Sequence, residues 1–185
     1  MMRTFGLVVE GQYDEAVLTE LVQKCIADPV EVATRVCSGS IMNKFPGFLE
    51  AFRRVKQGTH VDKALVIRDA NGGDPEELVS RMRDKIANRN YPFPVKCVVI
   101  VRELETWLLA DDRAISQVAS RAVPPVNESP EDIPAPKERL TRLLAQARVP
   151  YTSEVARSIA AAVDIDRLRY RCSRFGRFEE AVRDC

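Results

Sequence analysis

The chain has 185 residues, 45% of them hydrophobic and 30% charged, which is ordinary for a folded globular domain and excludes a disordered or fibrous protein. Its 28 basic and 27 acidic residues leave a net charge of +1, so no strong field of the whole molecule attracts nucleic acid. Any site for a polyanion must therefore be local.

Three short runs rich in Val, Ile and Leu predict strands that are buried on both faces of a sheet. They are residues 5–9, 63–67 and 95–101, and a weaker fourth run spans residues 30–37. Between these runs, apolar residues recur with helical spacing. The first such stripe is Val17, Leu18, Leu21, Val22 and Cys25, and the second is Phe45, Phe48, Leu49, Phe52 and Val55.

A third helix is predicted to begin at Asp74, because a capping side chain, a proline in the first helical position and an acidic first turn follow one another there. Strands and helices thus alternate as far as the fourth strand. Such alternation predicts an α/β fold with a doubly wound, mainly parallel four-stranded sheet, right-handed crossovers and helices on both faces.

Beyond Asp111 the strand pattern stops. Residues 123–136 contain five prolines among polar residues, which predicts an irregular surface connection. Helical spacing then returns and continues to the end of the chain. We therefore divide the chain into an α/β core (residues 1–121), a proline-rich connection (122–136) and a C-terminal helical extension packed on the core (137–185).

The cysteines and the apolar segments indicate the compartment. Five cysteines are present without any CxxC spacing, and their odd number fits reduced, mostly buried thiols; they are Cys25, Cys37, Cys97, Cys172 and Cys185. No segment has the apolar length of a membrane span or of a secretion signal. We expect a soluble, unexported, cytoplasmic protein.

Carboxylates follow three of the predicted strands. Glu10 comes after the first, Asp69 after the third, and Glu105 shortly after the fourth. Ligands of open α/β sheets bind at the carboxyl ends of the strands, and converging carboxylates favour a hard divalent cation. We expect these three residues to hold Mg²⁺ or Mn²⁺, with Asn71 and Glu103 as lesser ligands, although each residue taken alone would more often cap a helix or face water.

Three further residues beside these carboxylates could bind phosphate. Gly11 permits a positive-φ turn and a close approach of the backbone. Arg68 and Arg102 could clamp a phosphate, or could instead form salt bridges to neighbouring carboxylates.

Other polar residues have structural interpretations. Asp14 and Glu15 fall in the first turn of a helix and complement its dipole. Asp111 and Asp112 are placed to cap the helix that contains Ile115 and Val118, as Asp74 caps its own helix. His60 is the only histidine and is expected at the surface, so a catalytic triad and a histidine-rich zinc site both lack support.

Basic residues concentrate in residues 167–177, where they could track phosphates or form a solvated face. Phe175 and Phe178, three residues apart, look like a stripe that faces the core, and Trp107 also reads as core. No GxGxxG or GxxxxGK[ST] motif is present, so a nucleotide is not the obvious ligand.

Several motifs resemble those of a known family. They are residues 8–15 (Val-Val-Glu-Gly-Gln-Tyr-Asp-Glu), residues 69–71 (Asp-Ala-Asn) and, as the most specific, residues 105–111 (Glu-Thr-Trp-Leu-Leu-Ala-Asp). Pro136–Lys137 and residues 159–175 extend the likeness over nearly the whole chain. The chain thus resembles the Toprim-like proteins of domain-of-unknown-function family 4276, which are similar to the Toprim nuclease domains of the overcoming-lysogenization-defect family.

The resemblance implies a Toprim-like fold and Mg²⁺-dependent cleavage of phosphodiester bonds by activated water, with nucleic acid as substrate. Glu10 and Asp69 match the acidic residues of the Toprim scheme. Asn71 departs from that scheme, because the second aspartate of an Asp-x-Asp pair is replaced by an amide without charge.

Two other functions stay open. One is a non-catalytic or weakened regulatory subunit that acts with a partner ATPase, since similar nuclease domains are fused to or encoded beside ATPases in phage-defence systems. The other is a phosphohydrolase of small molecules, which the same carboxylates would serve.

Overall fold

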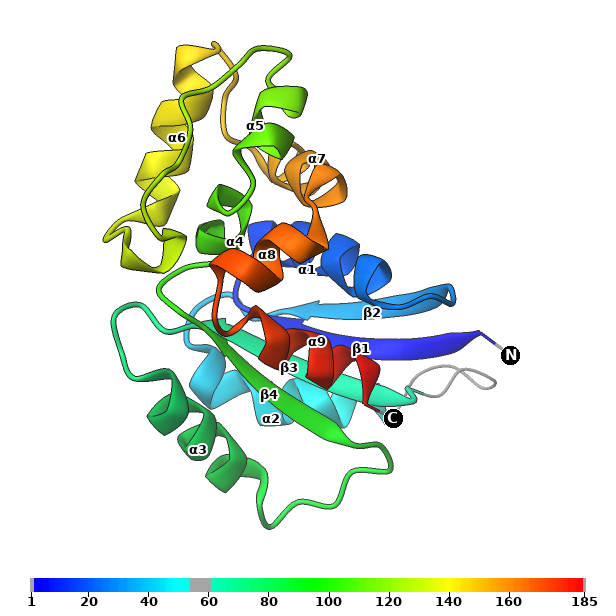
Figure 1. Cartoon of the computed structure of the whole chain (residues 1–185). Helices are drawn as coiled ribbons and strands as arrows, with labels where there is room; N and C mark the ends of the chain where they lie inside the picture. The colour runs from blue at the N-terminus through cyan, green and yellow to red at the C-terminus, as the bar shows by residue number, and fades with distance from the viewer. Residues whose placement is uncertain (1, 54–60, 185) are drawn as a thin grey trace.

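The computed structural model describes residues 2–53 and 61–184 (Figure 1). Its strands are β1 (Arg3–Val9), β2 (Val30–Val36), β3 (Lys63–Asp69) and β4 (Val95–Ile100). All neighbouring strands pair in parallel, in the order β2-β1-β3-β4. The predicted α/β fold with a doubly wound, four-stranded parallel sheet is therefore confirmed. Among the helices of the described residues, none combines the length and the apolar composition that a membrane span requires.

Helices cover both faces of the sheet. α2 (Ile41–Phe52) and α3 (Pro75–Ile86) share one hydrophobic cluster with Val8 of β1. α1 (Gln12–Cys25) lies on the opposite face, in a cluster with Leu7 and Val9. Successive side chains of a strand point to opposite faces, so a strand covered on both sides must be apolar throughout. This is why β1 and β3 could be recognised as uninterrupted apolar runs.

Gly6 of β1 is required by the packing of α2. A Cβ atom built on Gly6 would lie 2.8 Å from Cε2 of Phe52, which real side chains do not tolerate without movement. The phenyl ring therefore lies directly on the backbone of β1. The absence of a side chain at residue 6 sets how closely α2 approaches the sheet.

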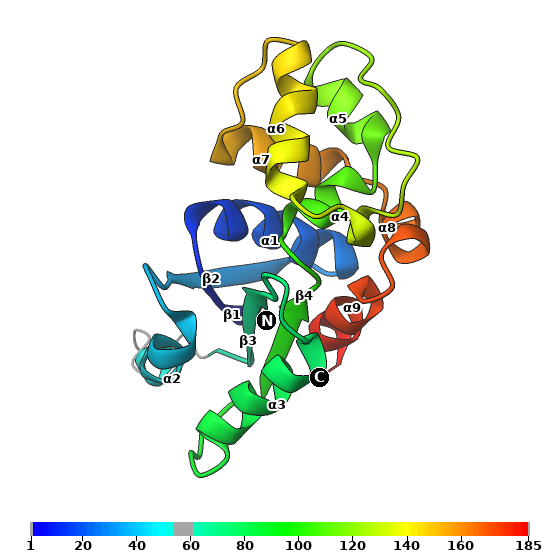
Figure 2. The same ribbon diagram turned by 90° about the vertical axis from the view of Figure 1, so that its left-hand side faces the viewer.

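After β4 the described chain is helical. The elements are α4 (Glu105–Leu109), α5 (Asp112–Val118), the 3₁₀ helix η1 (Pro130–Asp132), α6 (Pro136–Gln146), α7 (Ser153–Ala162), α8 (Ile165–Arg171) and α9 (Phe175–Arg183). Figure 2 shows α4, α5, α6 and α7 stacked beyond α1, on the side away from α2 and α3. Helix α9 returns to lie beside β4.

A single hydrophobic cluster joins these helices to the sheet. It runs from the strands through α1 to α6, α7 and α9, and it contains the buried Trp107. The indole ring lies 5.1 Å from the ring of Phe175 and 5.2 Å from that of Phe178. The interpretation of these three aromatic residues as core is confirmed.

Lys63, the first residue of β3, anchors the last helix. Its side chain is only 2% exposed, and its Nζ donates to the backbone oxygens of Ala181 at 3.0 Å, of Val182 at 2.6 Å, and of Asp184. A cation at the C-terminus of a helix stabilises the last carbonyl groups. The lysine thus fixes α9 to the edge of the core.

Some predictions fall outside the described residues: the surface position of His60, the place of Val55 in the second helical stripe, and the thiol of Cys185. The other four cysteines are free. As predicted, Cys25, Cys37 and Cys172 are buried, whereas Cys97 is partly exposed. Burial raises the pKa of Cys25 and Cys172 to about 12, so both are protonated thiols near neutral pH.

Candidate functional site

The strand order brings the predicted carboxylates to one edge of the sheet. β1, β3 and β4 are parallel neighbours, so their carboxyl ends lie side by side. Glu10 directly follows β1, Asp69 ends β3, and Glu105 begins α4 a few residues after β4. The strand order therefore brings Glu10, Asp69 and Glu105 to the same edge of the sheet, as the proposed site requires.

The charges of these side chains act on one another. Burial raises the pKa of Asp69 well above its ordinary value of 3.8, and the carboxylates of Asp14, Glu105 and Glu10 raise it further. Burial also raises the pKa of Asp14 to about 6, where the N–H of Gly11 opposes the shift and Glu10 and Glu105 add to it. We call Glu10, Asp14, Asp69 and Glu105 the carboxylate cluster.

The negative charge of the carboxylate cluster is only partly compensated. Burial raises the pKa of Glu10, although the Arg68 guanidinium and the backbone N–H of Asp69 lower it. Burial also raises the pKa of Glu105, whereas the hydrogen bond from the Tyr151 hydroxyl and the positive charge of Lys137 lower it. Carboxylates that are at least partly withdrawn from water and lie in one another's field favour a bound cation.

Asp14 has a second role that the sequence did predict. Its Oδ2 accepts a hydrogen bond from the backbone N–H of Gly11 at 2.8 Å, which completes a capping arrangement at the start of α1. The expected contribution to the helix N-terminus is confirmed. Its membership of the carboxylate cluster was missed, because a residue in the first turn of a helix already had a sufficient explanation.

The two lesser ligands lie in different surroundings. Asn71 is exposed in a turn with φ 47°, and its backbone N–H donates to the oxygen of Arg102 at 2.9 Å. Glu103 accepts a hydrogen bond from the backbone N–H of Lys137 at 3.1 Å and so serves the start of α6. Its charge nevertheless raises the pKa of Glu105, which places it near the carboxylate cluster.

The three residues considered for phosphate binding also differ. Gly11 has an extended backbone (φ −146°), so the expectation of a positive-φ turn there is wrong; the cap formed by Asp14 holds the residue in this conformation. Arg68 donates to the backbone oxygen of Asp69 at 3.0 Å, next to the carboxylate cluster. Arg102 donates to the backbone oxygen of Glu131 at 2.9 Å, which connects the end of β4 to η1.

The donor chemistry of the carboxylate cluster fits Mg²⁺ or Mn²⁺, because both ions prefer hard oxygen ligands. Within residues 2–53 and 61–184, however, no three His, Cys, Asp or Glu side chains are arranged to hold a metal ion. Carboxylates of the cluster must therefore turn toward one another before three of them reach the same ion. The metal site stays a prediction.

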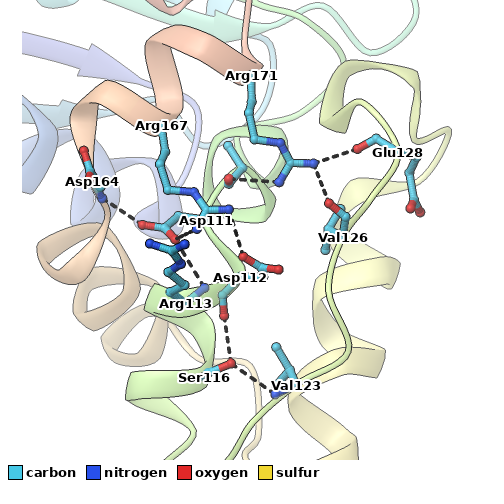
Figure 3. A network of polar contacts seen from close by, with 11 residues as sticks. Asp111, Asp112, Arg113, Ser116, Val123, Val126, Glu128, Asp164, Arg167 and Arg171 are labelled. Atoms are coloured by element: carbon cyan, nitrogen blue, oxygen red, sulfur yellow. Dashed lines mark hydrogen bonds and ion pairs between the residues drawn. The ribbon is translucent and has the colours of Figure 1, made fainter.

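A separate polar network explains the aspartate that ends the most specific motif (Figure 3). Asp111 is 3% exposed, and its carboxylate accepts from the backbone N–H groups of Arg113 at 3.2 Å and Asp164 at 2.9 Å. Arg167 lies 3.4 Å from Asp111 and 3.1 Å from Asp112. The predicted cap is confirmed for Asp111, which also joins the starts of α5 and α8.

The arginines of residues 167–174 are engaged in holding the fold. Arg171 donates to the backbone oxygens of Ala110 at 3.1 Å, Glu128 at 2.8 Å and also Val126, and so fastens the proline-rich connection (Figure 3). Ion pairs join Arg169 to Glu179 at 2.6 Å and Arg174 to Glu76 at 2.6 Å. These contacts favour a structural role over a phosphate track.

Two tyrosines and a lysine border the carboxylate cluster without having been recognised as site residues. The Tyr151 hydroxyl donates to Oε1 of Glu105 at 2.9 Å, and the Tyr13 ring packs on the Tyr151 ring. Nζ of Lys137 lies 4.9 Å from the centroid of the Tyr13 ring. Lys137 follows Pro136 in one of the motifs, whereas Tyr151 stands in a loop whose sequence carries no periodic signal.

Comparison with known proteins identifies a family. A family model described as a domain of unknown function, DUF4276, matches residues 9–183, which is nearly the whole chain and includes every residue of the carboxylate cluster. No curated protein and no solved structure matches the chain. The chain belongs to the DUF4276 family.

Proposed function

We propose that this protein is a metal-dependent phosphodiesterase that hydrolyses nucleic acid, the activity expected of a Toprim-like nuclease. The carboxylate cluster is the observation that carries the proposal. Its members meet at the carboxyl edge of a parallel sheet, where ligands of open α/β sheets bind, and the charges of the cluster raise the pKa of Asp14 and of Asp69. A divalent cation relieves such repulsion.

Glu10, Asp69 and Glu105 would hold Mg²⁺ or Mn²⁺, with Asp14 as a fourth carboxylate and Asn71 and Glu103 as lesser ligands. A bound ion of this kind supplies Lewis acidity toward a phosphate and lowers the pKa of water.

The residues of the chain supply proton transfer and substrate binding. Burial raises the pKa of Glu10 and of Glu105, which makes each carboxylate a stronger base, and we assign proton transfer to one of these two residues. Arg68 and Lys137 carry positive charge beside the cluster and would contact a substrate phosphate. Gly11 and Arg102 are further phosphate-binding candidates.

Cleavage assays with Mn²⁺ on single-stranded and duplex DNA and RNA test the proposal. We expect the wild-type protein to cut at least one substrate and Glu10→Ala to lose about 100-fold or more of that activity, as on removal of a group that transfers protons. The matched control is Glu31→Ala, which removes an exposed carboxylate from β2 and should leave activity unchanged. A Glu10→Ala protein that folds normally and cuts as well as wild type would contradict the proposal.

Two features favour a second function, a regulatory subunit with a weakened metal site that works with a partner ATPase. The amide of Asn71 stands where the Toprim scheme has an aspartate, and the carboxylate cluster is not preset to hold an ion. Asn71→Asp separates the two functions. Gains in Mn²⁺ affinity and in cleavage would support the weakened site, whereas losses would show that the amide belongs to an active enzyme. Either function would suit a role in phage defence, which the resemblance suggests.

A further inference from the structure

We infer that Tyr151 is a positioning residue of the carboxylate cluster, whose hydroxyl fixes the orientation of Glu105 and makes the C-terminal extension part of the site. The inference rests on the proposed binding of a metal by Glu105. Tyr151 lies just before α7, and 46 positions separate it from Glu105. The contact between them therefore depends on how the extension folds back on the core.

The hydrogen bond reaches a carboxylate that is sheltered from water. The Tyr151 hydroxyl donates to Oε1 of Glu105 at 2.9 Å, and Glu105 is only 4% exposed. Because water has little access, a lost donor is not freely replaced, and a buried carboxylate without its donor is costly. The bond holds Oε1 and thereby sets the direction in which Oε2 points.

Tyr151 is in turn held by α1. Its ring centroid lies 5.0 Å from that of Tyr13, with the ring planes tilted by 41°. The Tyr13 hydroxyl donates to the backbone oxygen of Tyr151 at 3.2 Å. Tyr13 immediately precedes Asp14, so the two tyrosines connect two members of the carboxylate cluster across the boundary between core and extension.

Tyr151→Phe isolates the contribution of the hydroxyl. The variant keeps the ring that packs on Tyr13, and the hydrogen bond from Tyr13 survives because its acceptor is a backbone oxygen. The matched control is Tyr91→Phe. Like Tyr151, Tyr91 donates one hydrogen bond through its hydroxyl, here to the backbone oxygen of Pro46 at 3.4 Å. Tyr91 packs in the hydrophobic cluster of α2 and α3, on the opposite face of the sheet.

Calorimetric titration of the full chain with Mn²⁺ tests the inference. We expect Tyr151→Phe to weaken Mn²⁺ binding about tenfold, the lower end of the range for residues that orient a metal ligand. Tyr91→Phe should bind Mn²⁺ like wild type. Tyr151→Phe leaves a buried carboxylate without its donor and should lower the thermal midpoint of the metal-free protein, whereas Tyr91→Phe should leave it close to that of wild type. Both variants are therefore titrated well below their midpoints, where circular dichroism shows them folded, so that a loss of affinity reports the orientation of Glu105 and not unfolding.

A second comparison distinguishes positioning from a general structural effect. Because Tyr151 acts through Glu105, Tyr151→Phe should cause no further loss of affinity in a Glu105→Ala background, which lacks the acceptor of the hydrogen bond and is titrated at the higher Mn²⁺ concentrations that its weakened site requires. An equal loss in both backgrounds would overturn the inference, as would a Tyr151→Phe protein that binds Mn²⁺ like wild type. If the wild-type protein itself fails to bind Mn²⁺, the proposed metal site falls and this inference falls with it.

Discussion

Asp14 accepts a hydrogen bond from the N–H of Gly11 while it lies in the field of Glu10 and Glu105. Burial and these charges raise its pKa from 3.8 to about 6, even though the hydrogen bond opposes the shift. Because only the folded state has the raised pKa, the unfolded chain loses the carboxyl proton of Asp14 at a lower pH than the folded protein does. The free energy of unfolding therefore decreases as the pH rises from 3.8 to about 6.

Asp14→Asn should make the metal-free protein more stable at pH 7 to 8, by about 1–2 kcal/mol, because the amide can keep the cap and carries no charge. The difference from wild type should become small below about pH 3, where the aspartate is mostly protonated in both the folded and the unfolded state. Urea unfolding in the presence of a chelator, repeated across this pH range, measures the effect.

The control for this prediction is Asp84→Asn, which neutralises an exposed aspartate of α3. It should change the free energy of unfolding by only a few tenths of a kcal/mol at any pH. A wild-type protein that is more stable than Asp14→Asn at pH 8 without metal would show that the carboxylates do not repel one another in the folded state.

At the residue scale, the sequence predicted the carboxylates that follow strands. It did not predict the residues whose role depends on contacts with distant parts of the chain. Glu10, Asp69 and Glu105 were found because the strands before them are apolar and the residues after them are polar. Tyr151 could not be found in this way, because its contact with Glu105 depends on the position of a loop within the C-terminal extension.

Among the elements, the contact between β1 and α2 gives the sharpest packing prediction. Gly6→Ala would place a methyl group within 2.8 Å of the Phe52 ring, so the ring or the helix must move. We expect a loss of about 1–3 kcal/mol in the free energy of unfolding, as is usual for an overpacked core. Chemical denaturation followed by circular dichroism provides the measurement.

Gly47→Ala is the matched control for Gly6→Ala. Gly47 lies within α2, and a Cβ atom there would meet nothing within 4 Å. Because alanine favours a helix over glycine, this change should stabilise the protein by up to about 1 kcal/mol. If Gly6→Ala proved as harmless as Gly47→Ala, close packing of Phe52 on β1 would be refuted.

Elements were easier to predict than their arrangement. Each strand and helix leaves a local pattern, such as the apolar run of β1 or the cap and proline that begin α3. The order β2-β1-β3-β4 leaves no such local pattern, because a strand buried on both faces looks the same at any position in the sheet. The convergence of the carboxylates depended on this order and could not be established before the fold was known.

For the whole molecule, the continuous hydrophobic cluster predicts one cooperative unit. The cluster includes strands of the core, α1 and helices of the C-terminal extension, and Lys63 ties α9 to β3. Differential scanning calorimetry should show a single transition whose van't Hoff and calorimetric enthalpies agree. Two separate transitions would mean that the extension folds independently of the core.

The central claim is that the carboxylate cluster holds a divalent cation, and calorimetric titration with Mn²⁺ and Mg²⁺ tests it most directly. We predict saturable binding by the wild-type protein that is lost in Glu10→Ala and in Asp69→Ala but kept in Glu31→Ala. The claim would be contradicted if a folded wild-type protein did not bind either ion. It would also be contradicted if Glu10→Ala and Asp69→Ala bound as tightly as wild type.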